Sequence, residues 1–146
     1  MIDIEIINDY KSNLVINNSK IKFLFKKVLN EEKINAAELS LILSNRPYLN
    51  KLKKKYFKQD HYTDVIAFNL NNENEDIVGE IYVSIDDVES NSKFFNISFD
   101  NEFCRVIIHG LLHIIGYEDN TIIKKKEMTE LENIYMLLIK ENLIKL

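Results

Sequence analysis

The sequence Arg105–Asp119, RVIIHGLLHIIGYED, is the most informative part of the chain. It contains His109 and His113, two of only three histidines, four residues apart in an apolar segment with helical spacing. Side chains four residues apart leave the same face of a helix, so one metal ion can bind both rings. Gly116 is the residue type that ends a helix in a left-handed backbone conformation. The sequence therefore predicts a helix that presents two histidines on one face and then turns back.

Two carboxylates, Glu118 and Asp119, follow the expected turn. With Asp119 the spacing is His-x3-His-x5-Asp, which supplies the three protein ligands of a catalytic metal site that keeps one position open. Imidazole and carboxylate donors suit zinc, with manganese and iron as alternatives, and a metal held there would activate water for hydrolysis. The competing interpretation is a pair of ordinary helix histidines, because a bare His-x3-His spacing is common. Gly110 disfavours a zinc peptidase of the HExxH type, which has its glutamate base at that position.

The segments around this helix predict an α+β fold. Alternating isoleucines at Ile2, Ile4 and Ile6 indicate a strand, and Asn17–Ser19 are cap residues for a following amphipathic helix. Further strands are expected near Leu39–Leu43 and at Thr63–Leu70 and Ile77–Ser84, the last two antiparallel, with a short helix beginning near Pro47. Helices are expected at about 86–96, 100–115 and 121–143, with no strand after Asp86.

The whole chain fits one domain, 1–146, because compact domains cluster at about 100 to 150 residues. Its net charge of −4 argues against a protein that coats nucleic acid with its whole surface, so any RNA contact must be local. A single cysteine, Cys104, suits a reducing cytoplasm. The longest apolar stretch, Val106–Ile115, is too short to span a membrane.

The sequence Arg105–Tyr117 resembles the signature of the YbeY family of rRNA maturation endoribonucleases. The family pattern is His-Gly-x-Leu-His, two residues, Gly, an aromatic residue, an acid and a final histidine, and Asp119 stands in place of that histidine. Thr63–Phe68 (TDVIAF) and Gly79–Ser84 (GEIYVS) resemble two further family segments. The resemblance covers about two thirds of the chain. A second departure is Phe57, which falls where many relatives carry an arginine.

This resemblance implies a zincin-like α+β domain with about four strands in a mixed sheet and about five helices. It implies one Zn²⁺ per chain, held by His109, His113 and Asp119, and cleavage of single-stranded RNA. The implied partners are rRNA and the small ribosomal subunit, in rRNA maturation and ribosome quality control. The alternatives are a ribosome-assembly factor with a mainly structural metal site and, more weakly, a zinc peptidase.

Two charged residues outside the triad are candidates for a role in the site. Arg105 precedes His109 by one helical turn and would hold the scissile phosphate, unless it pairs with an acid such as Glu102 or Asp86. Glu80 would orient a ligand imidazole or act as a base, unless it is a solvated strand residue.

A run of lysines precedes the Thr63–Phe68 segment and is interleaved with two aromatic residues. These lysines would contact phosphates and the aromatic rings would stack on bases of a single strand, unless the run is only a solvated helix face. The residues are Lys51, Lys53, Lys54, Lys55, Tyr56, Phe57 and Lys58. His61 has no partner at ligand spacing and is expected to lie outside the site.

Overall fold

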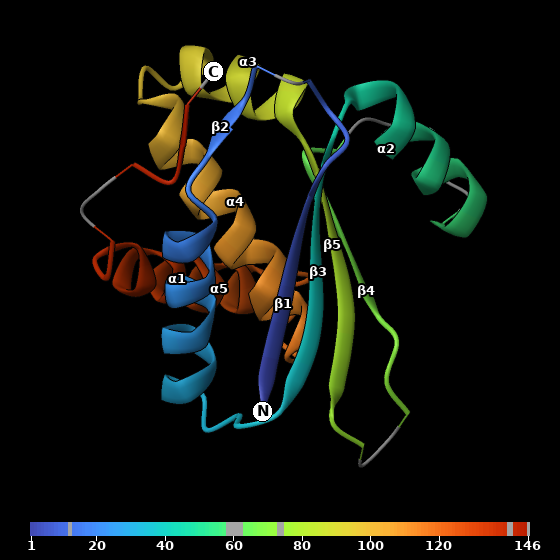
Figure 1. Ribbon diagram of the computed structural model, residues 1–146, viewed down its shortest axis with the longest axis vertical. Helices are drawn as coiled ribbons and strands as arrows, with labels where there is room; N and C mark the ends of the chain where they lie inside the picture. Colours follow the sequence, from blue (N-terminus) through green and yellow to red (C-terminus); the bar gives the residue numbers. More distant parts are fainter. Residues whose placement is uncertain (12, 58–62, 73–74, 140–141, 146) are drawn as a thin grey trace.

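Figure 1 shows the computed structural model, which describes residues 1–11, 13–57, 63–72, 75–139 and 142–145. The strands are β1 (Ile2–Asn8), β2 (Val15–Ile16), β3 (Ala37–Ser44), β4 (Val65–Asn69), β5 (Ile77–Ser84) and β6 (Ile144–Lys145). The helices are α1 (Asn18–Glu31), α2 (Arg46–Leu52), α3 (Ile85–Phe94), α4 (Phe99–Ile114) and α5 (Ile122–Met136), and a π-helical turn, η1 (Lys53–Phe57), follows α2. The expected α+β class is confirmed.

The main sheet has four strands in the order β1-β3-β5-β4. β1 and β5 each pair parallel to β3, with Ile4 opposite Leu39 and Leu41 opposite Ile81. β4 pairs antiparallel to β5, so the sheet is mixed, as expected. The predicted antiparallel pair of strands is therefore also confirmed.

The five helices of the described chain begin where a polar side chain caps the first turn. Each cap accepts a hydrogen bond from the backbone N–H three residues on, which satisfies a donor that has no partner within the helix. The caps are Asn17, Asn45, Ser84, Ser98 and Thr121.

The sheet has helices on both faces (Figure 1). On one face α1, α4 and α5 cover the sheet, and α4 supplies fully buried side chains such as Ile107 and Leu111 to the main core. That core reaches from Ile4 in β1 to Ile144 in β6. On the other face α2 packs Leu49 and Leu52 against Ile66, beside Phe68 and Tyr82. The histidine helix α4 is thus held between the sheet and the terminal helix.

Gly110 lets α4 approach the sheet closely. A Cβ at this position would lie 2.7 Å from Cγ2 of Ile81 and 3.1 Å from Cγ2 of Val65, so any larger residue would push the helix off β5 and β4. The glutamate that HExxH peptidases carry after the first histidine therefore has no space here. The glycine is a packing requirement at the point where the helix presents His109.

The C-terminal part of the chain differs from the sequence-based expectation. α5 ends at Met136 rather than near residue 143, and a strand, β6, does follow Asp86. β6 pairs antiparallel with β2 to form a second, two-stranded sheet. The Asp100 carboxylate accepts hydrogen bonds from the backbone N–H groups of Leu143 (2.6 Å) and Ile144 (2.9 Å), which fixes this return of the chain. Two-residue strands carry no readable periodicity, so the prediction missed them.

Among the described residues, the helices are all too short or too polar to cross a lipid bilayer.

Candidate metal centre

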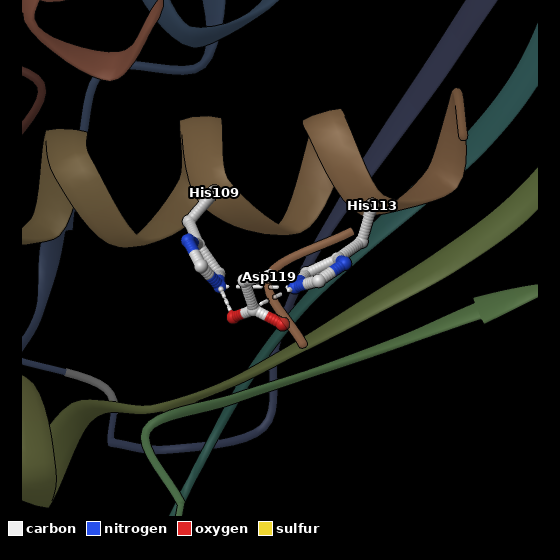
Figure 2. A group of neighbouring side chains, drawn as sticks. All are labelled: His109, His113 and Asp119. Carbon is white, nitrogen blue, oxygen red and sulfur yellow. Dashed lines mark hydrogen bonds and ion pairs between the residues drawn. The ribbon is translucent and has the colours of Figure 1, made fainter. Parts of the chain in front are cut away.

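His109 and His113 lie one turn apart on α4 and converge on one point (Figure 2). Their Nε2 atoms are 3.0 Å apart, and the two rings meet edge to face with centroids 4.6 Å apart. The His109 side chain is 25% exposed and that of His113 is 30% exposed. Both imidazoles are therefore held at the surface of a packed helix and remain accessible from one side.

Gly116 turns the chain back toward these two rings. Its φ of +112° is in the region that favours glycine, and its N–H donates to the His113 carbonyl (3.1 Å) while the Tyr117 N–H donates to Leu112 (3.0 Å). The expected helix end is confirmed. The Tyr117 hydroxyl donates to the Glu32 carboxylate at the end of α1 (2.6 Å), so the turn is anchored from a second element.

Asp119 completes the group after this turn. Its Oδ2 lies 3.4 Å from His109 Nε2 and 3.5 Å from His113 Nε2. Figure 2 shows the Asp119 carboxylate facing both rings. The neighbouring carboxylate, Glu118, instead accepts a bond from Lys124 Nζ at 2.9 Å. The structure therefore brings together the three residues that the sequence pattern selected.

The three atoms fit a small metal ion. They form a triangle with sides of 3.0, 3.4 and 3.5 Å, whose corners all lie about 1.9 Å from a common centre. Protein nitrogen and oxygen ligands bind zinc at about 2.0 to 2.2 Å. His109, His113 and Asp119 can therefore hold a metal ion without rearranging.

The partners of the two Nδ1 atoms determine the tautomer of each ring. His109 Nδ1 lies 2.7 Å from Glu132 Oε2, and His113 Nδ1 lies 3.0 Å from the backbone oxygen of Tyr117. A carboxylate and a carbonyl oxygen only accept hydrogen bonds, so both Nδ1 atoms carry the proton. The Nε2 lone pairs of two neutral rings then face each other at 3.0 Å together with a carboxylate oxygen. A proton or a metal ion between these atoms would relieve their mutual repulsion.

Electrostatics at His109 reinforce this demand for positive charge. Burial lowers the pKa of His109, but the hydrogen bond that His109 donates to Glu132 and the charges of Glu132, Asp119 and Asp64 outweigh burial, so the net pKa is raised. Burial also raises the pKa of Asp64, which lines a cavity together with His109 and His113 and accepts a hydrogen bond from the Asn91 side chain (3.3 Å). The negative charge around the histidines favours either a proton or a metal ion at the centre.

Glu132 on α5 was missed by the sequence analysis. It is 5% exposed, and its two carboxylate oxygens bind His109 and Arg105. One signal was available: Met128, Glu132 and Tyr135 share the buried face of α5, and an acid on an apolar face is unusual unless it is paired. The sequence does not reveal its partner, because 23 residues separate Glu132 from His109.

Arg105 contacts α5 rather than the cavity. Its guanidinium donates to Glu132 Oε1 at 3.1 Å and to Asn133 Oδ1 at 3.1 Å. The expected pairing with an acid is present, but the acid is Glu132 and not Glu102 or Asp86. Arg105 thus holds the carboxylate that orients His109.

Glu80 lies on the sheet face away from α4. Gly79 and Ile81, its neighbours in β5, contact Ile114 and Gly110 of that helix, so Glu80 points to the other side. There it accepts a bond from the Tyr82 hydroxyl at 3.4 Å. The expectation that Glu80 orients a ligand histidine is wrong, and Glu132 has that position.

A cavity of about 630 Å³ opens beside the metal group. His109, His113 and Asp119 form one wall of it, and Lys53 and Phe57 from η1 lie in the wall together with residues 63–67. Of the lysine run, Lys58 lies outside the described residues, and so does His61. The cavity connects the three ligand atoms with an aromatic and basic segment.

The sequence of this chain matches known proteins over most of its length. The family model of Endoribonuclease YbeY matches residues 6–140. An Endoribonuclease YbeY from Chloroherpeton thalassium is 40% identical over 80% of this chain and 82% of its own length. One from Borreliella afzelii is 33% identical over 91% of this chain and 92% of its own.

A solved structure is also similar. The solution structure of a Thermotoga maritima protein superposes with a TM-score of 0.61 at 31% identity, covering 91% of this chain and 86% of that one. Together with the matched residues 6–140, these likenesses show that the chain belongs to the YbeY endoribonuclease family.

Proposed function

We propose that this protein is a zinc-dependent endoribonuclease that cleaves single-stranded RNA, with one Zn²⁺ per chain held by His109, His113 and Asp119. The observation that carries the proposal is the convergence of two Nε2 lone pairs and one carboxylate oxygen within 3.0 to 3.5 Å of one another. Glu132 and the Tyr117 carbonyl hold the Nδ1 protons in place. A change of tautomer would break these hydrogen bonds, so it does not offer a way to reduce the repulsion between the Nε2 lone pairs.

The donor set favours zinc and an open coordination position. Two imidazoles and one carboxylate are typical of catalytic zinc sites with three protein ligands, whereas structural zinc sites have four. All three ligand residues line a cavity, so the fourth position has access to a substrate. Zinc bound here would supply a Lewis acid that activates water or stabilises charge on a phosphate oxygen.

The residues of the chain have separate tasks in this proposal. Glu132 and the Tyr117 carbonyl orient the histidines, and Arg105 holds Glu132 in place. Lys53, in the cavity wall, attracts the phosphate backbone. These residues prepare the site before a substrate arrives.

The biological setting of the proposal is maturation of small-subunit rRNA and ribosome quality control in the cytoplasm. It is supported by membership of the YbeY endoribonuclease family and by the sequence resemblance to its rRNA maturation enzymes. We take the whole chain, 1–146, as one catalytic domain, since the main core extends from Ile4 to Ile144.

The decisive test combines metal analysis with RNA cleavage. Zinc-loaded protein should cleave single-stranded RNA, lose this activity on removal of zinc and regain it when zinc is restored. The His113→Ala variant, purified in the same way, should bind no zinc and leave the RNA intact. Equal activity in both proteins would indicate a contaminating ribonuclease and sink the proposal. Cyclic phosphate ends on the products would indicate attack by the RNA 2′-hydroxyl, and their absence would indicate attack by water.

Stoichiometric zinc without RNA cleavage would instead favour an assembly factor with a structural metal. Casein hydrolysis that is lost on chelation would favour a peptidase. The packing of Gly110 against Ile81 argues against the second outcome, because it leaves no room for the usual glutamate base.

A further inference from the structure

Part of the wall of the cavity beside the candidate metal ligands is aromatic and basic. Phe57, 42% exposed, and Lys53 both line the cavity that contains His109, His113 and Asp119. Lys53 Nζ lies 4.9 Å from the centre of the Phe57 ring. The cavity therefore contains an exposed aromatic ring with a cation close to it. The candidate metal ligands do not depend on these two residues for their positions, so the ring and the cation are available to bind another molecule.

The Phe57 ring is held in position by packing. It stacks on Phe68 of β4, with centroids 5.7 Å apart and planes inclined by 25°. Phe68 in turn contacts the rings of Tyr56 (5.3 Å) and Tyr82 (5.8 Å) edge on. Because this cluster supports one side of Phe57, a planar ligand can stack on the ring without first ordering it, once the flexible Lys53 side chain moves from over the ring toward a phosphate.

The chemistry of this wall fits a nucleotide of a single strand. Bases of unpaired RNA stack on aromatic side chains, and lysine ammonium groups contact the phosphates that join them. The lysines of the same segment, including Lys51 and Lys55, provide local positive charge on a chain whose net charge is −4. An apolar small molecule would use the Phe57 ring but not the charge of Lys53, whereas a nucleotide offers a base to the ring and a phosphate to the ammonium group.

We propose that Phe57 and Lys53 form a nucleotide subsite beside the metal centre, in which one base of the RNA strand stacks on Phe57 and a phosphate contacts Lys53. This rests on the proposed function for the class of ligand. It adds a specific contact that selects single-stranded over paired RNA, because a base in a duplex is not free to stack on a side chain.

The test is binding of a short, unstructured 2′-O-methyl RNA strand to the zinc-loaded protein, with the strand shown to be intact afterwards. Phe57→Leu keeps an apolar side chain against Phe68 but removes the aromatic face, and it should weaken binding by about 5-fold to 100-fold. Phe57→Trp should bind within about 3-fold of the unmodified protein, because it retains an aromatic face. Thermal unfolding and zinc content of each variant separate loss of binding from loss of structure.

The chain offers a matched control. Phe23 on α1 is 49% exposed and has Lys27 Nζ 5.5 Å from its ring centre, but neither residue lines the cavity. Phe23→Leu and Lys27→Ala should therefore leave RNA binding unchanged. Lys53→Ala should weaken binding of all sequences alike and reduce the slope of log K against log salt by about 0.7.

A strand with one abasic nucleotide makes the test specific to stacking. The abasic position is moved along the strand, and the affinities of the unmodified protein and of Phe57→Leu are compared for each strand. At one position the two affinities should become equal, because the base that would stack on Phe57 is then absent. Equal affinity of Phe57→Leu and the unmodified protein would overturn the subsite, even if zinc-dependent cleavage is found. If the Phe57→Leu variant binds the strand more weakly but the zinc-loaded protein does not cleave RNA, the subsite is supported and the nuclease proposal is rejected.

Discussion

At the scale of single residues, the third candidate ligand, Asp119, distinguishes this chain from its family's sequence pattern. Asp119 brings a carboxylate where that pattern has a histidine, and its Oδ2 lies 3.4 Å and 3.5 Å from the two Nε2 atoms. A carboxylate adds negative charge to the metal and makes it a weaker Lewis acid. The aspartate thus keeps a geometry that could hold a metal ion, and it should lower the reactivity of a zinc ion bound there.

Replacing Asp119 tests this directly. Asp119→Ala should reduce zinc affinity by more than about 100-fold, since loss of a ligand costs more than loss of a supporting hydrogen bond. Asp119→His should retain zinc. Glu118→Ala is the matched control, because this adjacent carboxylate pairs with Lys124 and should not affect zinc. Competition with a chelating dye measures all three, and an equal loss in the Glu118 and Asp119 variants would refute the ligand assignment.

Glu132 is the second residue whose contribution can be isolated. Glu132→Gln retains an acceptor for His109 but loses the charge that binds Arg105, so zinc affinity should fall by about 10-fold to 100-fold. Glu130→Gln, at an exposed position on the same helix, should have no effect. The same titration measures both. Unchanged affinity of the Glu132 variant would mean that its carboxylate only packs the interface of α4 and α5.

The sequence predicts the three candidate ligands because they are close together along the chain. His109 and His113 are one helical turn apart, and Gly116 returns the chain so that Asp119 reaches both rings. Glu132 and the cavity wall at Phe57 depend on how α5 and η1 pack against α4 and β4. Spacing along the chain carries no information about these contacts, so they appear only in the folded structure.

At the scale of elements, the position of α4 against the sheet depends on one small residue. Gly110→Ala gains about 1 kcal/mol of helix propensity but places a methyl group 2.7 Å from Cγ2 of Ile81, which is fully buried. Overpacking of this kind costs about 1 to 3 kcal/mol. We expect a net loss of about 1 kcal/mol in the free energy of unfolding, measured by urea denaturation, together with weaker zinc binding because His109 moves with the helix.

A second substitution identifies the cause. Ile81→Leu removes the Cγ2 branch that Gly110→Ala would meet, so the cost of Gly110→Ala should shrink in that background. If the two substitutions are additive, the close approach of α4 to β5 is not what excludes larger residues.

Elements with a strong repeating pattern were predicted well, and short ones were not. α4 and the β4–β5 pair lie close to their expected limits, because buried faces impose a period on many residues. α5 stops at Met136 because the chain then returns to pair β6 with β2, and this is fixed by distant contacts such as those of Asp100. A two-residue strand is too short for its sequence to specify it.

At the scale of the whole molecule, the same helices that form the main core also position the candidate metal site. α4 contributes buried side chains to the main core and also carries two of the candidate metal ligands. α5 supplies Glu132, and Glu32 at the end of α1 accepts a hydrogen bond from Tyr117 in the loop that carries Asp119. Zinc binding should therefore stabilise the entire domain rather than a single loop.

The size of this stabilisation should depend on pH. With zinc at about 100 times its dissociation constant, the added stability is about 2.7 kcal/mol, which raises the melting temperature by about 10 °C in a chain of this size.

In the metal-free protein the pKa of His109 is raised, so its protonated form stabilises the fold below about pH 6.5 and this contribution is lost as pH rises through the raised pKa. Zinc requires the unprotonated Nε2, so its contribution moves in the opposite direction. The difference in melting temperature between zinc-loaded and metal-free protein should thus be small at about pH 5.5 and large at about pH 8, and His113→Ala should show none at either pH. A difference that is independent of pH would mean that the ion is not bound by the histidines.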